Sequence, residues 1–436
     1  MRALALLLIL WPASAAAQAP PTAIIDVTLV PLDRERVLPH RTVLVRDGRV
    51  ARIGPAGRAA LPPGVTRIDG HGKYLIPGLA DLHVHLFDSN DLLLYLANGV
   101  TTIRNLGGYG AADSILELRR QVAGGERTGP TIYTSGNWLD GDPPVRRINT
   151  VLRTPVEARA EVERQARAGY DFVKVYATLA PDVYREITDA ARDKGIPVTG
   201  HIPGAVGLDG VLRGGQVAVD HAGQLAGLGE AGRLAARLRA GGLSVTTTLV
   251  MLRLSLSMRG APERVEELLA RREATYLSPA TRQFWRDAPF VGMPRTEAAL
   301  AMYPRSEELM RALDAAGVPL LLGTDAGLWG NVPGFSALEE LRLLVESGLT
   351  PFRALRAATV APAEFLNRHV RGADQPGVIA EGGRADLVLL EGNPLEDIAH
   401  VQRRAGVMVR GEWFPAERLD SLLRTLERRY AGEAER

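Results

Sequence analysis

The sequence predicts an α/β fold: a (β/α)8 barrel with a small β-sandwich domain formed by the N- and C-terminal segments. Between residues 76 and 372, short apolar runs alternate with helical stretches rich in Ala, Leu, Arg and Glu. Such alternation is typical of βα units built around a parallel sheet. Outside these limits, runs with a two-residue apolar period and turn signals such as Asp47-Gly48 indicate a separate β-rich module.

The β-rich module takes its strands from both ends of the chain. Residues 20–75 contain three candidate runs, AIIDVTLVPL, RTVLVRDGRVARIG and TRIDGHGKYL. Similar runs return in residues 373–418 as GVIAEGGRADLVLLEGNP and AGVMVRGEW. One sandwich built from both segments is the simplest account of them. Residues 419–436 then form a C-terminal helix or tail.

The central segment contains eight apolar runs that predict the barrel strands: GLADLHVHL, TTIRNLG, TIYTSGN, DFVKVYA, IPVTGHI, QVAVDHA, LSVTTTLV and VPLLLGTDA. Helical stretches such as EARAEVERQARAG and SALEELRLLVESG lie between them. Eight strands match a closed barrel of the usual size, about 250 residues. Residues 252–300 are additional to eight regular βα units. We expect this Arg- and Glu-rich insertion to form a lid or side cover.

Composition excludes several classes of function. The chain has 436 residues, of which 46% are hydrophobic and 23% charged, as in ordinary globular proteins. A formal net charge of +2 offers no basic stripe for nucleic acid and no polybasic anchor for lipid. The absence of cysteine excludes disulfides, thiolate zinc sites and a cysteine nucleophile.

The first residues predict export. Arg2 supplies a positive start, an apolar stretch runs to Trp11, and the small residues up to Ala17 supply a cleavage site. We therefore expect residues 1–17 to be a cleaved signal peptide and the protein to be periplasmic or secreted. The apolar stretch is about half the ~20 residues of a spanning helix, so no membrane span is expected after cleavage.

Histidine and aspartate residues stand at the ends of the predicted barrel strands. His83 and His85 form an H-x-H, and strand alternation puts both side chains on one face. His201, His221 and Asp325 close later strands. A single strand-end histidine is usually structural, and a single aspartate after Gly-Thr is often a helix cap. The joint pattern predicts a metal site, because these points meet at the mouth of a barrel, where catalytic residues lie.

Lys174 belongs to the same series. It lies in the apolar run FVKVY of a chain with only three lysines among its 52 basic residues. His83 to Lys174 spans 91 residues, or three βα units of about 30 residues. The 104 residues from His221 to Asp325 exceed two such units by about the length of the insertion. An ordinary buried salt bridge remains the alternative role for Lys174.

These motifs resemble those of the amidohydrolase superfamily, in particular the imidazolonepropionase-like enzymes and the metal-dependent Xaa-Pro dipeptidases. The resemblance covers nearly the whole chain after the signal peptide. It rests on VRDGRVARIG, IDGHGKYLIPGLADLHVHL, GVTTIRNLGG, DFVKVY, VTGHIPGAVG, VDHAG, LLLGTDAG, LTPFRALRAATVAPAEFL and EGGRADLVLLEGNPLEDI, in that order.

The resemblance implies two divalent metal ions, for which imidazole and carboxylate ligands favour zinc. By that resemblance, His83 and His85 bind the more buried metal, and His201 and His221 bind the more exposed one. Lys174, carboxylated by CO2, bridges the two metals. Asp325 binds the first metal and acts as the base.

The sequence departs from the family pattern at three points. Arg104-Asn105 stands where relatives often have Arg-Asp, and Val175-Tyr176 follows the lysine where many peptide-cleaving relatives have a small or Met-containing segment. Dipeptidase activity itself is therefore in doubt. His201 is followed by Ile202-Pro203-Gly204, so the His-x-x-Glu pattern of deaminating relatives is absent.

The expected reaction is hydrolysis of an amide or peptide-like C–N bond of a small substrate by a hydroxide that bridges the metals. Asp325 would pass the proton of this nucleophile to the leaving nitrogen. Tyr176, two residues beyond Lys174, would either hydrogen-bond the developing oxyanion or simply pack in the mouth. Substrate contacts are expected in the loops that follow the strands, where the candidates are Trp138, Arg146, Arg147 and Trp329. Either arginine could clamp a substrate carboxylate.

Two other functions stay open on the same residues. A lactonase, esterase or phosphoesterase could use the same metal centre, and a non-catalytic binding protein could use the metals only for stability. The open coordination position implied by the ligand set argues against the second. The expected partner is a small dipeptide-like or N-acyl compound and no nucleic acid, while association into a homo-oligomer stays open.

Overall fold

The computed structural model describes residues 21–58, 60–107 and 112–434. The expected signal peptide, residues 1–17, lies outside the described residues. Within them, no helix combines the length and the apolar character that a crossing of the membrane requires.

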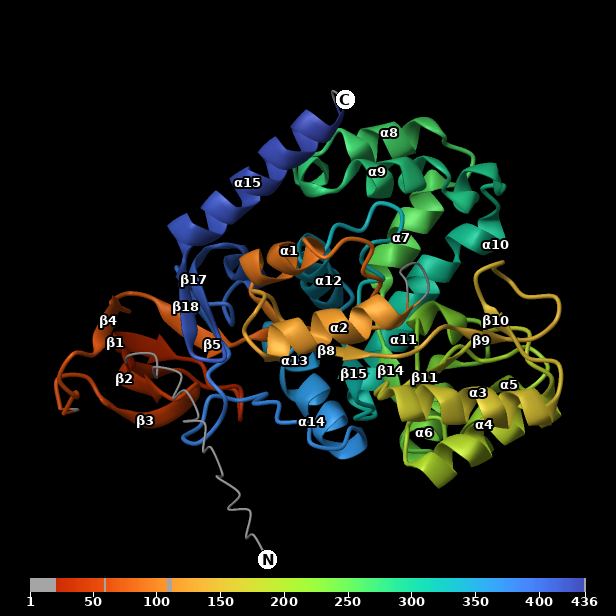
Figure 1. The fold of residues 1–436 in the computed structure, drawn as a ribbon, viewed down its shortest axis with the longest axis horizontal. Coiled ribbons are helices and arrows are strands. Elements are labelled where there is room, and N and C mark those ends of the chain that lie inside the picture. The colour runs from red at the N-terminus through yellow and green to blue at the C-terminus, as the bar shows by residue number, and fades with distance from the viewer. Residues whose placement is uncertain (1–20, 59, 108–111, 435–436) are drawn as a thin grey trace, which may run out of the picture.

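Strands from both chain ends share one eight-stranded sheet. Its members are β1 (Thr22–Leu29), β2 (Leu38–Arg46), β3 (Arg49–Pro55), β4 (Thr66–Asp69), β5 (Tyr74–Pro77), β16 (Leu387–Leu390), β17 (Arg404–Val409) and β18 (Glu412–Pro415). The order is β18-β17-β16-β5-β1-β2-β3, and β4 also pairs with β1. In Figure 1 these strands form a module at one side of the molecule.

The two halves of this sheet join where β16 pairs antiparallel with β5. Alternate apolar residues of both halves form a common core, which includes Ile24, Val43, Leu75, Leu387 and Met408. Strands of both terminal segments therefore belong to one sheet. The structure records one branched sheet in them, so the sandwich stays a prediction.

The central segment contributes parallel strands. They are β6 (Leu79–Val84), β7 (Val100–Asn105), β8 (Thr131–Thr134), β9 (Leu139–Asp140), β10 (Thr150–Val151), β11 (Val173–Val175), β12 (Val198–Gly200), β13 (Ala218–Val219), β14 (Ser244–Thr246) and β15 (Leu320–Leu321). One sheet has the order β6-β7-β8 and the other β10-β9-β11-β12-β13-β14-β15.

Backbone contacts connect the two parallel sheets at both edges. A parallel bridge between Ser135 and Phe172 links the end of β8 to β11. On the other side, the Leu82 amide donates to the Leu322 carbonyl at 2.8 Å, and Val84 is bridged to Ala326. The resulting arrangement is a TIM-barrel-like α/β fold, which agrees with the predicted fold class.

Helices flank these strands. They are α1 (Asp91–Ala97), α2 (Ala112–Ala123), α3 (Pro155–Ala168), α4 (Pro181–Lys194), α5 (Gly207–Gly214), α6 (Ala231–Ala240), α11 (Met302–Ala315), α12 (Phe335–Glu346), α13 (Pro351–Ala357), α14 (Val360–His369) and α15 (Ala416–Ala434), with short 3-10 turns η1 (Ala222–Gln224) and η4 (Ile398–Gln402). α3 shows why such segments are helical. Thr154 and Glu157 form a capping box, Pro155 opens the first turn, and Gly169 ends the helix in the left-handed conformation.

Residues between β14 and α11 form a helical cover over one side of the barrel. It comprises α7 (Leu249–Met258), α8 (Glu263–Leu269), η2 (Arg272–Tyr276), α9 (Pro279–Arg286), η3 (Pro289–Gly292) and α10 (Glu297–Leu300). In Figure 1, α9 lies beside α15. The indole N–H of Trp285 donates to the Gly327 carbonyl at 3.1 Å, so this cover contacts the segment after β15. It occupies the part of the chain in which the insertion was expected.

Candidate metal centre

The predicted ligands lie in or directly after the parallel strands. His83 lies in β6 and Lys174 in β11, while His201 follows β12 and His221 follows β13 closely. Asp325 lies four residues beyond the end of β15. Because the carboxyl ends of parallel strands share one end of the fold, the spacing seen in the sequence becomes proximity in space.

His83, His85 and Asp325 converge most closely. Nε2 of His85 lies 2.9 Å from Oδ1 of Asp325, and Nε2 of His83 lies 3.0 Å from the same oxygen. One potential ligand atom from each of the three lies within 4.8 Å of the others. All three side chains are buried. A hydrogen bond between Nδ1 of His85 and the Gly107 carbonyl, at 2.7 Å, orients that ring.

His201 and His221 lie next to this group. The His221 ring centroid is 4.4 Å from that of His83 and 5.0 Å from that of His201. Nδ1 of His221 is 3.9 Å from Oδ2 of Asp325 and 3.1 Å from the Thr248 hydroxyl. The structure therefore brings together the four histidines and the aspartate that the sequence singled out.

Lys174 reaches the group through an aspartate that the sequence analysis missed. Nζ of Lys174 donates to Oδ2 of Asp220 at 3.0 Å, and both side chains are buried. Arg104 donates to the other oxygen of Asp220 at 2.8 Å. Nδ1 of His83 is 3.7 Å from that same oxygen. The only signal for Asp220 in the sequence is its position directly before His221 at the end of a predicted strand.

Burial dominates the protonation of this site. It lowers the pKa of His85 and of His201, and it lowers the pKa of His221 to about 3. Burial also opposes ionisation of Asp325, but the neighbouring His83 and His221 hold the pKa of its carboxyl well below the ordinary value. These shifts favour neutral imidazoles at His85, His201 and His221 and a carboxylate at Asp325, the protonation states in which these side chains bind metals.

The residues present fit a divalent metal. Both ring nitrogens of His83 are buried, and neither makes a hydrogen bond of normal geometry within the part of the chain that the structure describes, although Nε2 lies 3.0 Å from Asp325. A buried polar group without a hydrogen bond is rare in proteins and needs an explanation. Nitrogen and oxygen donors from His83, His85 and Asp325 supply a ligand set that zinc or a related ion accepts.

Two of these residues have strained backbones. His221 has a φ of 70° and Asp325 a φ of 62°, both in the left-handed region. Non-glycine residues rarely adopt it, and such strain tends to occur at functional sites. The Asp325 backbone is held in place by β6, because the Asp325 amide donates to the His83 carbonyl at 2.8 Å.

An aromatic row extends from the centre on one side. Trp138 lies edge-on to His85, with 5.3 Å between ring centroids, and stacks on Tyr176 at 5.0 Å. Tyr176 in turn stacks on His201 at 4.0 Å. Trp138 and Tyr176, which were predicted as substrate and oxyanion contacts, thus both pack directly against the candidate ligands.

The other predicted substrate residues lie farther out. The guanidinium of Arg146 lies over the Trp329 ring, 5.1 Å from its centroid, and Phe284 of α9 stacks on that ring at 5.2 Å. Nε of Arg146 and Nε1 of Trp329 are buried without a hydrogen-bond partner among the described residues. Arg147 is exposed, and the structure does not bring it to this group.

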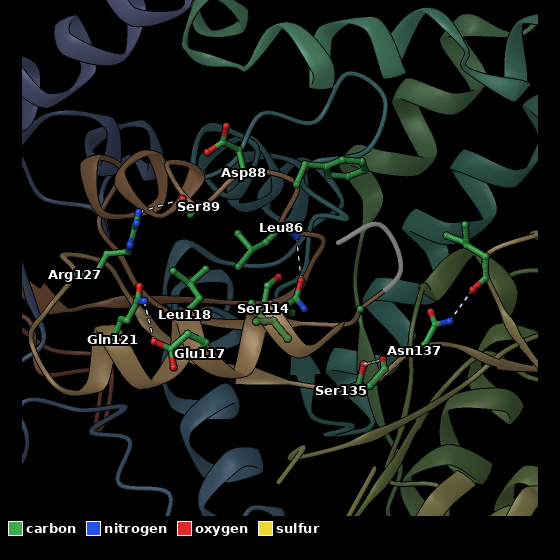
Figure 2. A pocket seen from close by; sticks show the side chains of 16 residues that line it. Leu86, Asp88, Ser89, Ser114, Glu117, Leu118, Gln121, Arg127, Ser135 and Asn137 are labelled. Carbon is green, nitrogen blue, oxygen red and sulfur yellow. Dashed lines mark hydrogen bonds between the residues drawn. The ribbon is translucent and has the colours of Figure 1, made fainter. Parts of the chain in front are cut away.

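A cavity of about 740 Å³ lies beside the centre, between α2 and the segment after β6. Figure 2 shows Leu86, Ser114, Leu118 and Arg127 around it, with Asn137 at the other end. Its lining includes Gly107, whose carbonyl binds His85, but none of the predicted ligands. The cavity therefore adjoins the candidate centre without containing it.

A TIM-barrel-like fold that carries histidines, a lysine and an aspartate at its strand ends defines the class of metal-dependent hydrolases. The sequence matches the model of the amidohydrolase family over residues 74–414. The chain belongs to this family, which confirms the resemblance seen in the sequence.

Individual relatives agree with that assignment. Ochratoxinase from Aspergillus niger is 25% identical over 455 aligned residues, which cover 87% of this chain and 83% of the relative. Imidazolonepropionase from Stenotrophomonas maltophilia is 25% identical, with coverage of 86% and 92%. The solved structure of bottromycin amidohydrolase has a TM-score of 0.75 and 26% identity, with coverage of 94% and 90%. The protein is an enzyme of the amidohydrolase type, and these homologues hydrolyse C–N bonds.

Proposed function

We propose that the protein is an exported amidohydrolase that hydrolyses an amide or peptide-like bond in a small substrate. The observation that carries this proposal is the convergence of His83, His85 and Asp325 within 4.8 Å, with His201 and His221 beside them. Relatives named ochratoxinase and imidazolonepropionase support an attack on a C–N bond. The parallel strands β6 to β15, whose two sheets are bridged at both edges, support a closed barrel as the scaffold.

Two divalent ions, proposed to be zinc, would be held by residues of this centre. His83, His85 and Asp325 would hold the first, His201 and His221 the second, and Lys174 as a carbamate would contact both. When bound, such ions polarise a substrate carbonyl and lower the pKa of water to about 7. In the structure, Nζ of Lys174 donates to Asp220, and this bond holds Nζ in the buried interior of the barrel.

Protein groups perform the proton transfer and the orientation of the substrate. Asp325 would accept the proton of the attacking water and deliver it to the leaving nitrogen, because its carboxylate stays ionised at the centre of the histidines. Tyr176, which stacks between Trp138 and His201, would donate a hydrogen bond from its hydroxyl to the developing oxyanion.

Substrate choice is proposed to lie in the loops that follow the strands. Arg146 would bind a substrate carboxylate, since its guanidinium face rests on Trp329 and its Nε has no partner among the described residues. This favours N-acyl amino acids or dipeptide-like compounds. Arg147 is a weaker candidate, because it is exposed.

Metal analysis combined with activity profiling tests the proposal. The wild type should bind about two equivalents of divalent metal and release amine from members of an N-acyl amino acid and dipeptide panel. Lys174→Ala should lose metal. Asp325→Asn should lose at least about 100-fold in kcat, the lower range for removing a general base.

The matched control is Lys194→Ala, which removes a surface lysine paired with Glu163 and should leave metal content and activity unchanged. A single metal per chain, or a fully active Lys174→Ala, would contradict the two-metal proposal. Lactones and phosphoesters belong in the same panel. Turnover of these compounds without any amine release would favour an esterase or phosphoesterase on the same centre.

A further inference from the structure

The start of α7 is built in an unusual way beside His221. The helix begins at Leu249, and Thr248 stands at its N-cap position with a φ of 50°. A β-branched residue rarely adopts this left-handed conformation. An N-cap threonine ordinarily accepts a hydrogen bond from the first turn of its own helix. The Thr248 side chain makes no such bond, and its hydroxyl lies 3.1 Å from Nδ1 of His221 instead.

The first turn of α7 is capped from another helix. Glu340 of α12 accepts hydrogen bonds from the Leu249 amide at 2.9 Å and from the Val250 amide at 2.7 Å. These N–H groups belong to the first turn, where a helix has no acceptors of its own. The Glu340 side chain is fully buried, and α12 packs against α7. Figure 1 shows both helices in the upper half of the barrel.

A buried carboxylate is a costly way to cap a helix, because ionised groups lose hydration on burial. The usual solution, the hydroxyl of Thr248 itself, is present in the chain at the correct position. In the structure Glu340 caps the helix, and the Thr248 hydroxyl contacts Nδ1 of His221 instead. A purely structural cap does not explain this exchange of partners.

We propose that Glu340 is a positioning residue for His221. By capping α7 from α12, it releases the Thr248 hydroxyl and holds the strained Thr248 backbone that directs this hydroxyl to the imidazole. When Nδ1–H donates to Thr248, Nε2 carries the lone pair that a metal ligand needs. The inference rests on the proposed function, because it treats His221 as a ligand, and it adds how that ligand is oriented.

Metal titration separates this role from general stability. Removing a group that orients a ligand typically weakens metal affinity about 10- to 100-fold. Glu340→Ala and Thr248→Ala should each weaken the second equivalent of Zn²⁺ by that factor in a chelator competition, while the first equivalent binds as in the wild type. Glu340→Gln keeps one acceptor oxygen and should recover part of the loss. The double variant Glu340→Ala/Thr248→Ala should bind no more weakly than Thr248→Ala alone, because both changes remove the same hydrogen bond.

Thr154→Ala is the control, because it removes the side-chain cap of α3, whose residues take no part in the centre. It should lower the melting temperature and leave both metal affinities unchanged. If Glu340→Ala behaved like Thr154→Ala, or if the double variant lost the product of the two single effects, the positioning role would be overturned.

A metal-free measurement distinguishes failure of the inference from failure of the proposed function. In protein with ¹⁵N-labelled histidine, His221 should be a single Nδ1–H tautomer in the wild type and a mixture in Glu340→Ala. If the wild type bound only one metal and the tautomer still changed in Glu340→Ala, the two-metal proposal alone would be overturned. An unchanged tautomer in Glu340→Ala would overturn the positioning role whatever the metal content.

Discussion

At the scale of single residues, the interior of the barrel contains a network of buried charges. Asp220 accepts from Lys174 and from Arg104, and all three side chains are buried. Removing one partner of such a pair leaves an uncompensated buried charge, which typically costs about 3–5 kcal/mol. This cost approaches the whole free energy of unfolding of a marginally stable domain. Arg104 therefore has a structural role, although the sequence analysis named it only as the neighbour of Asn105, where the chain departs from the family pattern.

Asp91 allows a prediction about pH dependence. It opens α1 as a buried carboxyl, and burial raises its pKa from 3.8 to about 7. The folded state thus binds this proton more tightly than the unfolded state does. Its contribution to stability is fully present below pH 3.8 and is lost as the pH rises through 7. At ~1.4 kcal/mol per pKa unit the loss amounts to about 4 kcal/mol at most.

Asp91→Asn should remove this dependence, because the amide is neutral at every pH. The measurement is urea denaturation of both proteins from pH 4 to pH 9. The free energy of unfolding of the wild type minus that of the variant should fall across this range. A difference that stays constant with pH would show that Asp91 titrates normally in the folded protein.

At the scale of elements, the helical cover between β14 and α11 is tied to the candidate centre. Trp285 of α9 is buried and bonds the Gly327 carbonyl, and a side chain at Gly327 would approach the His85 carbonyl to 2.1 Å. Gly327 also has a φ of 96°, which favours glycine. The cover is therefore in contact with the segment that holds Asp325 beside His85.

Trp285→Ala should loosen this cover. The expected results are faster hydrogen exchange in residues 259–300 and a rise in KM that exceeds the fall in kcat, because the segment after β15 loses its support while the ligands stay. Trp413→Ala is the control, since Trp413 packs on the core of the terminal sheet. It should lower stability without changing KM. Equal effects of the two variants on KM would argue against a role of the cover in substrate binding.

At the scale of the whole molecule, the two chain ends depend on each other. β16 lies between β5 and β17, and α15 returns to α1, where the Tyr430 hydroxyl contacts Asp88 and Asn90. Without β17, the edge of β16 and the apolar side chains of the shared core would be exposed, which promotes aggregation.

Truncation after residue 403 should therefore abolish cooperative thermal unfolding and produce aggregates in size-exclusion chromatography. Truncation after Ala431 keeps Tyr430 and serves as the control, with a melting temperature close to that of the full chain. A monomeric protein truncated after residue 403 that melted like the full chain would show that the barrel is independent of the terminal sheet.

The sequence by itself determined the alternation of strands and helices and the residue types of the centre. Strand periodicity depends on local polarity, and βα spacing is regular, so His83, His85, His201, His221 and Asp325 could be placed at strand ends without coordinates. Family motifs then identified the class of enzyme, and the match over residues 74–414 confirms it.

Only the tertiary structure decided which groups meet these residues. Asp220 binds Lys174 across 46 residues of sequence, and Glu340 caps α7 from 91 residues away. Such partners depend on the direction of side chains and on the packing of distant elements, which no local pattern encodes. Arg147 illustrates the same limit, because its charge suited substrate binding but the fold leaves it exposed.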